Sequence, residues 1–254
     1  MLEVLNLTKL YYGSPVVNHV TFSIGSGEVL GYLGPNGSGK STTVKMLTGL
    51  VDPSSGQIYY RGRSIREDMI GYKRIVGYVP EEPYLYLYMS GREYLQLAGR
   101  LRGLQERSMN QKIDALLELF SLFPYRLSAV SSYSKGMRQK TLIIAALLHN
   151  PEVVIFDEPL SGLDVTAALV FRSLIQSLAS DGKAILYSSH VLEVVERVST
   201  RVLILRKGAV VAHDSPQHLR NLLGSPTLED VFAQLVNQED TAKIAQDIAA
   251  VIRS

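Results

Sequence analysis

The segment Gly34–Thr42 constrains the fold of this chain more than any other stretch of its sequence. It reads Gly-Pro-Asn-Gly-Ser-Gly-Lys-Ser-Thr and matches the pattern G-x-x-x-x-G-K-[ST]. Glycines in such a loop let backbone N–H groups converge on anionic oxygens, and the helix that follows adds its dipole. The apolar run Val29–Leu33 precedes the loop, and a helical pattern over Ser41–Leu50 follows it. The order of strand, loop and helix therefore predicts a phosphate-binding site.

Two side chains of this loop carry charge and metal chemistry. Lys40 is a point charge for the β- and γ-phosphates of a nucleotide, and the Ser41 hydroxyl is a Mg²⁺ ligand in loops of this pattern. A glycine turn with no ligand is the alternative, and the flanking strand and helix argue against it. We therefore expect a nucleotide and Mg²⁺ at this loop.

The run Val153–Glu158 is apolar and ends in two acids. A continuous apolar run is typical of a buried parallel strand, and functional residues gather at the carboxyl ends of such strands. Asp157 is expected to hold Mg²⁺, and Glu158 to polarise an attacking water. His190 follows a third apolar run, Ala184–Ser188; taken alone, it also fits a structural histidine beside a helix start.

Short apolar runs alternate with helical patterns along most of the chain. This alternation favours an α/β fold with a mostly parallel sheet. The opening third is rich in strands, whereas residues 80–150 predict a mostly helical insert. Besides the runs already named, the expected strands are Val4–Leu7, Val16–Ile24, Gln57–Arg61, Ile75–Val79, Val202–Leu205 and Ala209–Ala212, and the expected helices lie within Gly91–Phe123 and over Ser134–His149.

Composition excludes several classes of function. The chain has 254 residues, no cysteine and a formal net charge of +2. The lack of cysteine excludes thiolate metal sites and cysteine nucleophiles, and the small charge argues against a nucleic-acid partner. The longest aliphatic run, Leu142–Leu148, has seven residues, whereas a membrane span needs about 20. We therefore expect no membrane span, and the first residues show no secretion signal.

Taken in order, these segments resemble the ATP-binding cassette of ABC transporters over about Leu2–Leu223. Gly34–Thr42 is similar to the Walker A loop, and Val153–Glu158 to the Walker B strand with its catalytic glutamate. Ser161–Asp164 resembles the D-loop, and His190 the switch histidine that contacts the γ-phosphate. The resemblance implies a P-loop NTPase core with a mostly parallel sheet, an N-terminal antiparallel β subdomain and a helical insert. Its implied divisions are a nucleotide-binding domain over 1–224, with a helical subdomain at about 80–150, and a C-terminal helical tail over 225–254.

The resemblance also implies a set of ligands for ATP and Mg²⁺. Tyr11 falls where the family has an aromatic residue that stacks on adenine, and Tyr12 is the alternative. The implied catalytic residues are Lys40, Glu158 and His190, and the implied metal ligands are Ser41, Glu81 and Asp157. The implied nucleotide-binding residues are Tyr11, Gly34, Pro35, Asn36, Gly37, Ser38, Gly39, Lys40, Ser41, Thr42, Glu81, Ser134 and Gly136.

Two parts of the chain depart from the usual family pattern, and a third resembles one group within the family. The signature motif keeps Ser134 and Gly136, whereas its other positions depart from the family pattern. Glu81 stands where the family usually has a glutamine, and its carboxylate adds negative charge beside the metal and the γ-phosphate. This substitution and the tail segment Pro226–Phe232 are similar to the ATPase subunits of two-component exporters.

The resemblance therefore implies an ATP-binding and ATP-hydrolysing subunit that dimerises around two ATP molecules. The second ABC ATPase chain completes each site through its signature motif, in a homodimer or a heterodimer. The pair drives a separate integral membrane permease, for export, from the cytoplasmic face of the membrane; the contact is expected at Tyr84, Tyr86 and Tyr88. The alternatives are an importer ATPase subunit, a soluble ABC ATPase outside transport, and a cassette that binds ATP without turnover.

Overall fold

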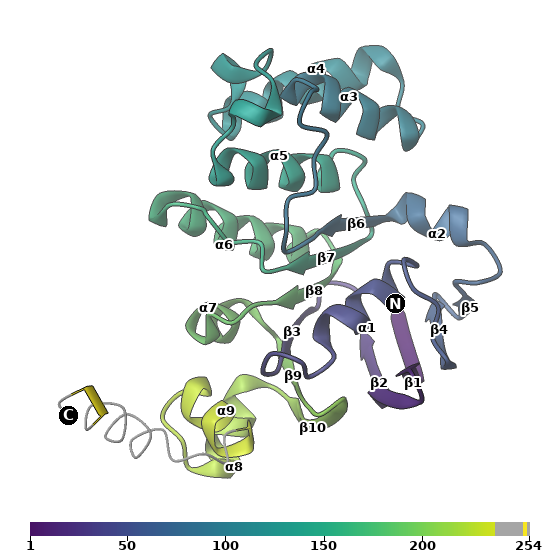
Figure 1. The fold of residues 1–254 in the computed structure, drawn as a ribbon, viewed down its shortest axis with the longest axis vertical. Helices are drawn as coiled ribbons and strands as arrows, with labels where there is room; N and C mark the ends of the chain where they lie inside the picture. The colour runs from purple at the N-terminus through teal and green to yellow at the C-terminus, as the bar shows by residue number, and fades with distance from the viewer. Residues whose placement is uncertain (237–250, 253–254) are drawn as a thin grey trace.

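The computed structural model describes residues 1–236 and 251–252, and their arrangement is shown in Figure 1. The chain begins with a four-stranded antiparallel sheet in the order β2-β1-β4-β5. Its strands are β1 (Leu2–Tyr11), β2 (Ser14–Ile24), β4 (Ser55–Tyr60) and β5 (Arg63–Ser64). The predicted N-terminal antiparallel subdomain is confirmed.

The second sheet has six strands in the order β10-β9-β3-β8-β7-β6. All neighbours pair in parallel except β10, which is antiparallel to β9. The strands β3, β7 and β8 are buried along their whole length, as their continuous apolar runs predict. The bounds are β3 (Val29–Leu33), β6 (Val76–Val79), β7 (Val153–Asp157), β8 (Ala184–Ser188), β9 (Arg201–Arg206) and β10 (Ala209–Asp214).

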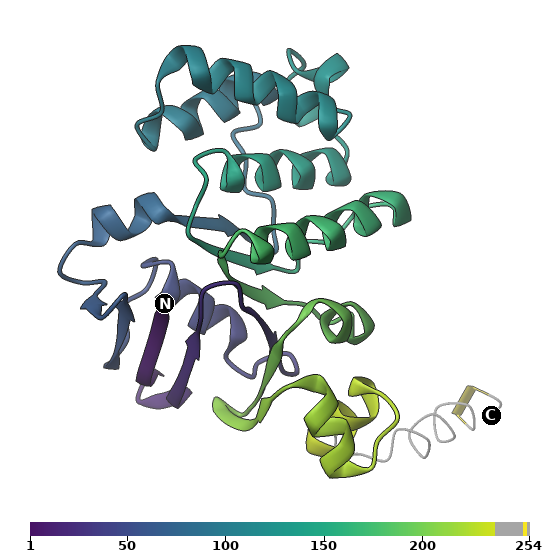
Figure 2. The same ribbon diagram turned by 180° about the vertical axis from the view of Figure 1, so that it is seen from behind.

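Helices α3 to α9 follow one another from one end of the molecule to the other. Figures 1 and 2 show α3 and α4 at one end, then α5, α6 and α7 beside the sheet, and α8 and α9 at the opposite end. The helix bounds are α1 (Lys40–Leu47), α2 (Met69–Ile75), α3 (Gly91–Leu101), α4 (Glu106–Leu119), α5 (Lys135–Leu147), α6 (Val165–Ser180), α7 (Leu192–Val198), α8 (Pro216–Leu223) and α9 (Leu228–Val236).

Three groups of buried side chains hold these layers together. Alternate residues of a strand point to opposite faces, so Ile155 of β7 belongs to the core against the antiparallel sheet, and Phe156 to the core under α6 and α7. Phe156 meets Phe171 of α6 edge to face, with ring centroids 4.9 Å apart. A third core, around Met109 and Ile144, joins α3, α4 and α5. The sheet that carries the phosphate loop is thus packed on both faces.

The structure differs from the sequence-based expectations at several boundaries. The expected strand Ile75–Val79 begins one residue late, because Ile75 is the last residue of α2, a helix that was not predicted. Helix α1 ends at Leu47 instead of Leu50, because Gly49 adopts φ 65° and stops it. The division at residue 224 stays a prediction. The part of the expected C-terminal helical tail beyond residue 236 falls almost wholly outside the described residues.

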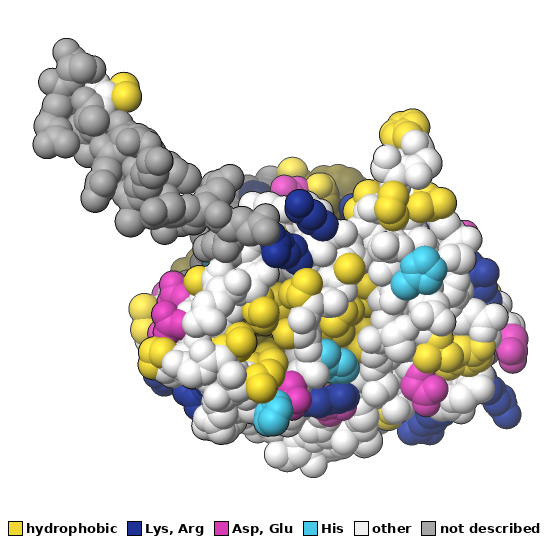
Figure 3. Space-filling model, turned by 90° about the horizontal axis from the view of Figure 1, so that it is seen from below, with side chains coloured by type: hydrophobic (Ala, Val, Ile, Leu, Met, Phe, Trp, Pro, Cys, Tyr) yellow, Lys and Arg dark blue, Asp and Glu magenta, His cyan; other side chains and the backbone are white. Residues whose placement is uncertain are grey.

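No helix within the described residues has both the length and the apolar character of a membrane span. At the end of the molecule where α8 and β10 lie, hydrophobic side chains gather near the middle of the face. Basic, acidic and histidine side chains lie around them (Figure 3).

Candidate functional site

The loop between β3 and α1 lines a cavity of about 630 Å³, and all nine residues of Gly34–Thr42 belong to its lining. Gly39 is the N-cap of α1 with φ 102°, a conformation that side-chain-bearing residues rarely adopt. A Cβ atom at Gly39 would also lie 2.6 Å from the carbonyl oxygen of Val16. The backbone can therefore follow this path only with glycine, and the start of α1 opens onto the cavity.

Four predicted residues from other strands line the same cavity: Glu81, Asp157, Glu158 and His190. They follow or end β6, β7 and β8, which are neighbours in the parallel sheet. The carboxyl ends of parallel strands meet at one edge, so residues from three separate parts of the chain reach one cavity. The structure thus brings together the predicted phosphate loop, the two acids of β7 and the histidine.

Lys40 is the cationic residue of the phosphate loop. Its Nζ donates hydrogen bonds to the carbonyl oxygens of Gly34 and Pro35, the second at 3.1 Å. Burial lowers the pKa of Lys40, and the carboxylates of Glu158 and Asp157 oppose that shift. The ammonium group is therefore held within the loop by two carbonyl oxygens, and the carboxylates of the cavity favour its charged form.

Asp157 is the last residue of β7, and only 4% of it is exposed. Burial raises the pKa of its carboxyl group, and the charge of Glu81 adds to the increase. The charges of Lys40 and Lys45 oppose the increase without cancelling it, and a buried carboxylate is unfavourable unless positive charge compensates it. The position of Asp157 therefore suits a carboxylate that binds a further cation.

Glu158 adopts an unusual backbone conformation, with φ 48°. Its N–H donates to the carbonyl oxygen of Ser188 at 2.9 Å, which ties the turn to the end of β8. The carboxylate lies 2.8 Å from Nδ1 of His190 and accepts a hydrogen bond from the Ser189 hydroxyl at 3.3 Å. Burial raises the pKa of Glu158, and His190 and Ser189 oppose the shift. A carboxylate with a raised pKa, held by two partners, is suited to accept a proton.

Other predicted site residues lie away from this cavity. Tyr11 is 40% exposed, with Nζ of Lys9 5.3 Å from its ring centroid, and it is not part of the cavity lining. Ser134 caps α5 by accepting a hydrogen bond from the N–H of Met137 at 3.2 Å. Gly136 packs so closely on Gly162 that a Cβ would lie 2.6 Å from its carbonyl oxygen. The roles predicted for Tyr11, Ser134 and Gly136 toward ATP stay predictions.

Five lining residues were given no site role from the sequence: Val16, Leu33, Ser189, Leu192 and Phe232. Ser189 stands inside the quoted segment before His190, and its contact with Glu158 depends on how β7 and β8 pair. Phe232 comes from α9, far along the chain, and no local pattern marks such a residue as part of the cavity.

The comparison with known proteins supports the same family as the motifs. The family model described as ABC transporter matches residues 17–161. The ABC transporter ATP-binding protein NatA of Bacillus subtilis is 37% identical over 217 residues, which cover 85% of this chain and 88% of NatA. An uncharacterised ABC transporter ATP-binding protein of Methanocaldococcus jannaschii is 37% identical over 210 residues, covering 83% of this chain and 76% of that protein.

Solved structures share the architecture. The structure of an ATP-binding subunit of an ABC transporter superposes with a TM-score of 0.87 at 34% identity, over 92% of this chain and 99% of that one. A dimeric ATP-binding cassette in a post-hydrolysis state, bound to ADP and Pi, shares the fold with a TM-score of 0.79 at 23% identity, over 85% of this chain and 98% of that one. The predicted family and fold class are thereby confirmed: this chain is an ATP-binding protein of the ABC transporter family.

Proposed function

We propose that this chain hydrolyses ATP as one half of a dimer and so drives a separate membrane permease, in the direction of export. One observation carries the proposal: a phosphate loop, two strand-end carboxylates and a histidine line one cavity of about 630 Å³. A phosphate loop alone supports binding, whereas Glu158 in contact with His190 adds a group that can act on water.

ATP binding rests on the loop Gly34–Thr42 and the start of α1. Backbone N–H groups and the helix dipole stabilise the phosphates, and Lys40 exchanges its contacts with Gly34 and Pro35 for phosphate oxygens. The new contacts also offset the burial that lowers the pKa of Lys40.

The donor groups of the cavity fit Mg²⁺. The ion takes oxygen ligands and keeps several waters, and the Ser41 hydroxyl and the buried carboxylate of Asp157 supply such oxygens. Among the described residues, no three acidic or histidine side chains form a metal-holding group by themselves, so phosphate oxygens and water would complete the shell. When bound, Mg²⁺ supplies charge neutralisation on the phosphates. Glu81 lines the same cavity and is the further candidate ligand.

Hydrolysis then depends on Glu158 and His190. The oxygen of the attacking water bonds to the γ-phosphorus while the Glu158 carboxylate takes a proton from that water. The bond between the γ-phosphorus and the bridging oxygen breaks, and ADP leaves with its electron pair. The raised pKa of Glu158 makes it a stronger proton acceptor than an exposed glutamate. Nδ1 of His190 orients the carboxylate, and the imidazole ring lies 79% exposed, accessible to the γ-phosphate.

The dimer explains why the signature residues lie apart from the cavity. Ser134 is exposed at the N-terminus of α5, and neither Ser134 nor Gly136 lines the cavity of its own chain. A second cassette, identical or related, would present these groups to the phosphates from the opposite side. The dimeric cassette bound to ADP and Pi, which shares this fold, supports that arrangement.

Two exposed regions suit the permease. In the loop before α3, Tyr84 and Tyr88 are 79% and 81% exposed. Exposed tyrosines are typical of protein interfaces, because the apolar ring packs against a partner while the hydroxyl group forms hydrogen bonds. A hollow of about 400 Å³ between the end of α1, α2 and the end of α3 combines apolar and basic side chains: Leu50, Ile70, Leu101, Lys73, Arg74 and Arg102 line it. An amphipathic helix with acidic residues complements such a surface.

The Glu158→Gln variant tests the catalytic assignment. It keeps the shape of the side chain and removes the proton acceptor, so ATP turnover is expected to fall at least about 100-fold. ATP should then hold the chains together, which light scattering with and without ATP detects as a dimer. The exposed Glu118→Gln is the matched control and should keep the wild-type rate. Wild-type turnover by Glu158→Gln would show that the assignment is wrong.

Mild detergent extraction tests the partner. The chain should co-purify with an integral membrane protein, and Tyr84→Ser combined with Tyr88→Ser should reduce the amount recovered at an unchanged ATPase rate. Recovery of the chain with no membrane protein would contradict the permease proposal. Transport assays in oriented vesicles then give the direction of movement.

A further inference from the structure

Phe232 brings the C-terminal part of the chain to the nucleotide cavity. It belongs to α9, and it lines the cavity together with Leu192, the first residue of α7. Both side chains also pack on the core under α6 and α7. Helix α9 therefore contacts at once the core of the fold and the side of the cavity from which α7 begins.

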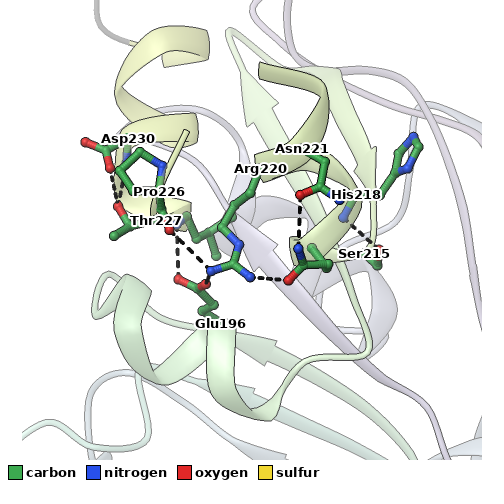
Figure 4. Close-up of polar contacts among 10 residues, drawn as sticks. Glu196, Ser215, His218, Arg220, Asn221, Pro226, Thr227 and Asp230 are labelled. Carbon is green, nitrogen blue, oxygen red and sulfur yellow. Dashed lines mark hydrogen bonds and ion pairs between the residues drawn. The ribbon is translucent and has the colours of Figure 1, made fainter. Parts of the chain in front are cut away.

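One acidic side chain of α7 connects both C-terminal helices. Oε1 of Glu196 lies 2.8 Å from the guanidinium of Arg220 in α8, and its Oε2 accepts a hydrogen bond at 3.0 Å from the N–H of Leu228, the first residue of α9. Arg220 also donates to the carbonyl oxygen of Pro226 at 3.3 Å. Figure 4 shows Glu196 below the point where α8 and α9 approach each other. The carboxylate of Glu196 on α7 thus contacts both α8 and α9. Through Arg220 it is also linked to the turn between them.

The environment of this pair differs from that of the other ion pair on α7. The side chains of Arg220 and Glu196 are 28% and 22% exposed, whereas those of Arg197 and Glu193 are 57% and 72% exposed. Water and salt weaken an exposed pair, so the Glu193 pair contributes little to the position of the helix. The more enclosed pair, with its additional backbone hydrogen bonds, fixes where α7 lies relative to α8 and α9.

Helix α7 needs such support, because it has seven residues and its N-cap, Val191, makes no side-chain capping bond. Helices of this length are held by tertiary packing, not by their own propensity. His190 stands two residues before the helix, and its side chain is 79% exposed. The place of His190 beside Glu158 therefore depends on where α7 begins.

We propose that Phe232 and Glu196 are positioning residues for ATP hydrolysis: together they hold α7 on the α8–α9 pair and so keep His190 beside Glu158. The inference rests on the proposed ATPase activity. It assigns the C-terminal helices a role in the rate of the chemical step, since α9 packs on α7 and Phe232 lines the cavity together with Leu192, two residues after His190.

The first test compares three variants of α9 in steady-state ATPase assays of the full chain, with rates expressed per folded protein. Phe232→Ala should lower kcat about tenfold and change KM for ATP less than about threefold, while Phe232→Leu, which keeps an apolar side chain on the core and in the cavity lining, should recover most of kcat. Leu235→Ala is the matched control, because Leu235 packs on the same core but does not line the cavity. It should lower Tm and leave kcat within about twofold.

The second test uses the two acidic residues of α7. Glu196→Gln keeps an acceptor for the N–H of Leu228 but removes the charge that faces Arg220, and it should lower kcat about three- to tenfold. Glu193→Gln on the same helix should leave kcat unchanged. Equal kcat in wild type, Phe232→Ala and Glu196→Gln would overturn the inference, as would a rise in KM at constant kcat, which indicates direct contact with ATP. A wild-type chain without ATPase activity would instead refute the proposed function.

Discussion

Gly31 is a point at which α7 packs closely on the sheet. It lies in the middle of β3, and a Cβ at this position would lie 2.6 Å from Cγ1 of Val195 and 2.7 Å from Oγ of Ser199. Cγ1 of Val202, on the neighbouring strand β9, would be 2.9 Å away. Carbon atoms in contact prefer about 3.5–4.0 Å, so the change Gly31→Ala forces α7 to move outward.

The expected loss of stability follows from these contacts. Val195 and Val202 are fully buried, so neither side chain can turn into solvent to make room. Extra methyl groups in a packed core cost about 1–3 kcal/mol, and we expect about 2 kcal/mol for Gly31→Ala. Val195→Ala alone removes two buried methyl groups and should cost about 2 kcal/mol, from lost burial and a small cavity. Two independent changes would therefore cost about 4 kcal/mol together.

The two changes are not expected to be independent. Val195→Ala removes only the nearest of the three close atoms, while Oγ of Ser199 at 2.7 Å and Cγ1 of Val202 at 2.9 Å remain. The double variant should therefore lose about 3 kcal/mol instead of about 4. Urea unfolding followed by circular dichroism measures all four free energies of unfolding. Each kcal/mol corresponds to about 2–4 °C in Tm for a chain of this size. An additive loss in the double variant, or no loss in Gly31→Ala, would refute the reasoning.

Three further changes test other parts of the molecule. Lys40→Ala should weaken the binding of a fluorescent ADP analogue about 10- to 100-fold, because it removes a charge-assisted contact with phosphate; unchanged affinity in a fluorescence titration would contradict this role. Gly136→Ala should destabilise the fold by about 1–2 kcal/mol in urea, because the new Cβ would lie 2.6 Å from the carbonyl oxygen of Gly162; a more stable variant would refute the close contact. Burial and the charge of Arg102 lower the pKa of His149 to about 4, whereas its value in the unfolded chain is about 6.5. The unfolded chain therefore takes up this proton first as pH falls from 6.5 to 4. The free energy of unfolding should drop by about 1 kcal/mol between pH 7.5 and 5, after allowance for solvent screening, and His149→Gln should lose less than wild type.

The parallel sheet and the phosphate loop were predictable because their signals are local. A strand buried on both faces is mostly apolar, and β3, β7 and β8 follow this rule within five residues each, apart from the last residue of β7, Asp157, and of β8, Ser188. The loop Gly34–Thr42 needs its glycines for backbone reasons that hold in any chain. The order of these segments then identifies the family before any contact between them is known.

Other features were missed for different reasons. Helix α8 carries clear local signals that were overlooked: Ser215 caps it, Pro216 is its first residue, and Gly224 ends it with φ 63°. No local signal exists for Phe232, because its place in the cavity follows from the packing of α9 on α7. The contact between Ser189 and Glu158 likewise depends on the register of β7 against β8. Sequence patterns therefore locate the groups that carry charge, whereas the apolar and hydroxyl groups that orient them require the folded structure.

Glu158 illustrates why the site departs from the local rules that the rest of the sheet obeys. A left-handed backbone at a residue with a side chain costs about 1–3 kcal/mol, and burial raises the pKa of its carboxyl group, which also disfavours the charged form. Both costs persist because the fully buried strands β7 and β8 on either side hold the turn, through the hydrogen bond from its N–H to Ser188. The same turn directs the carboxylate toward Ser189 and His190 and away from the sheet. Stability of the sheet is thus what allows an unfavourable conformation at the one residue expected to act on water. His190, the other half of that contact, stands two residues before α7, and the close packing of α7 at Gly31 and its ion pair at Glu196 therefore bear on the same contact.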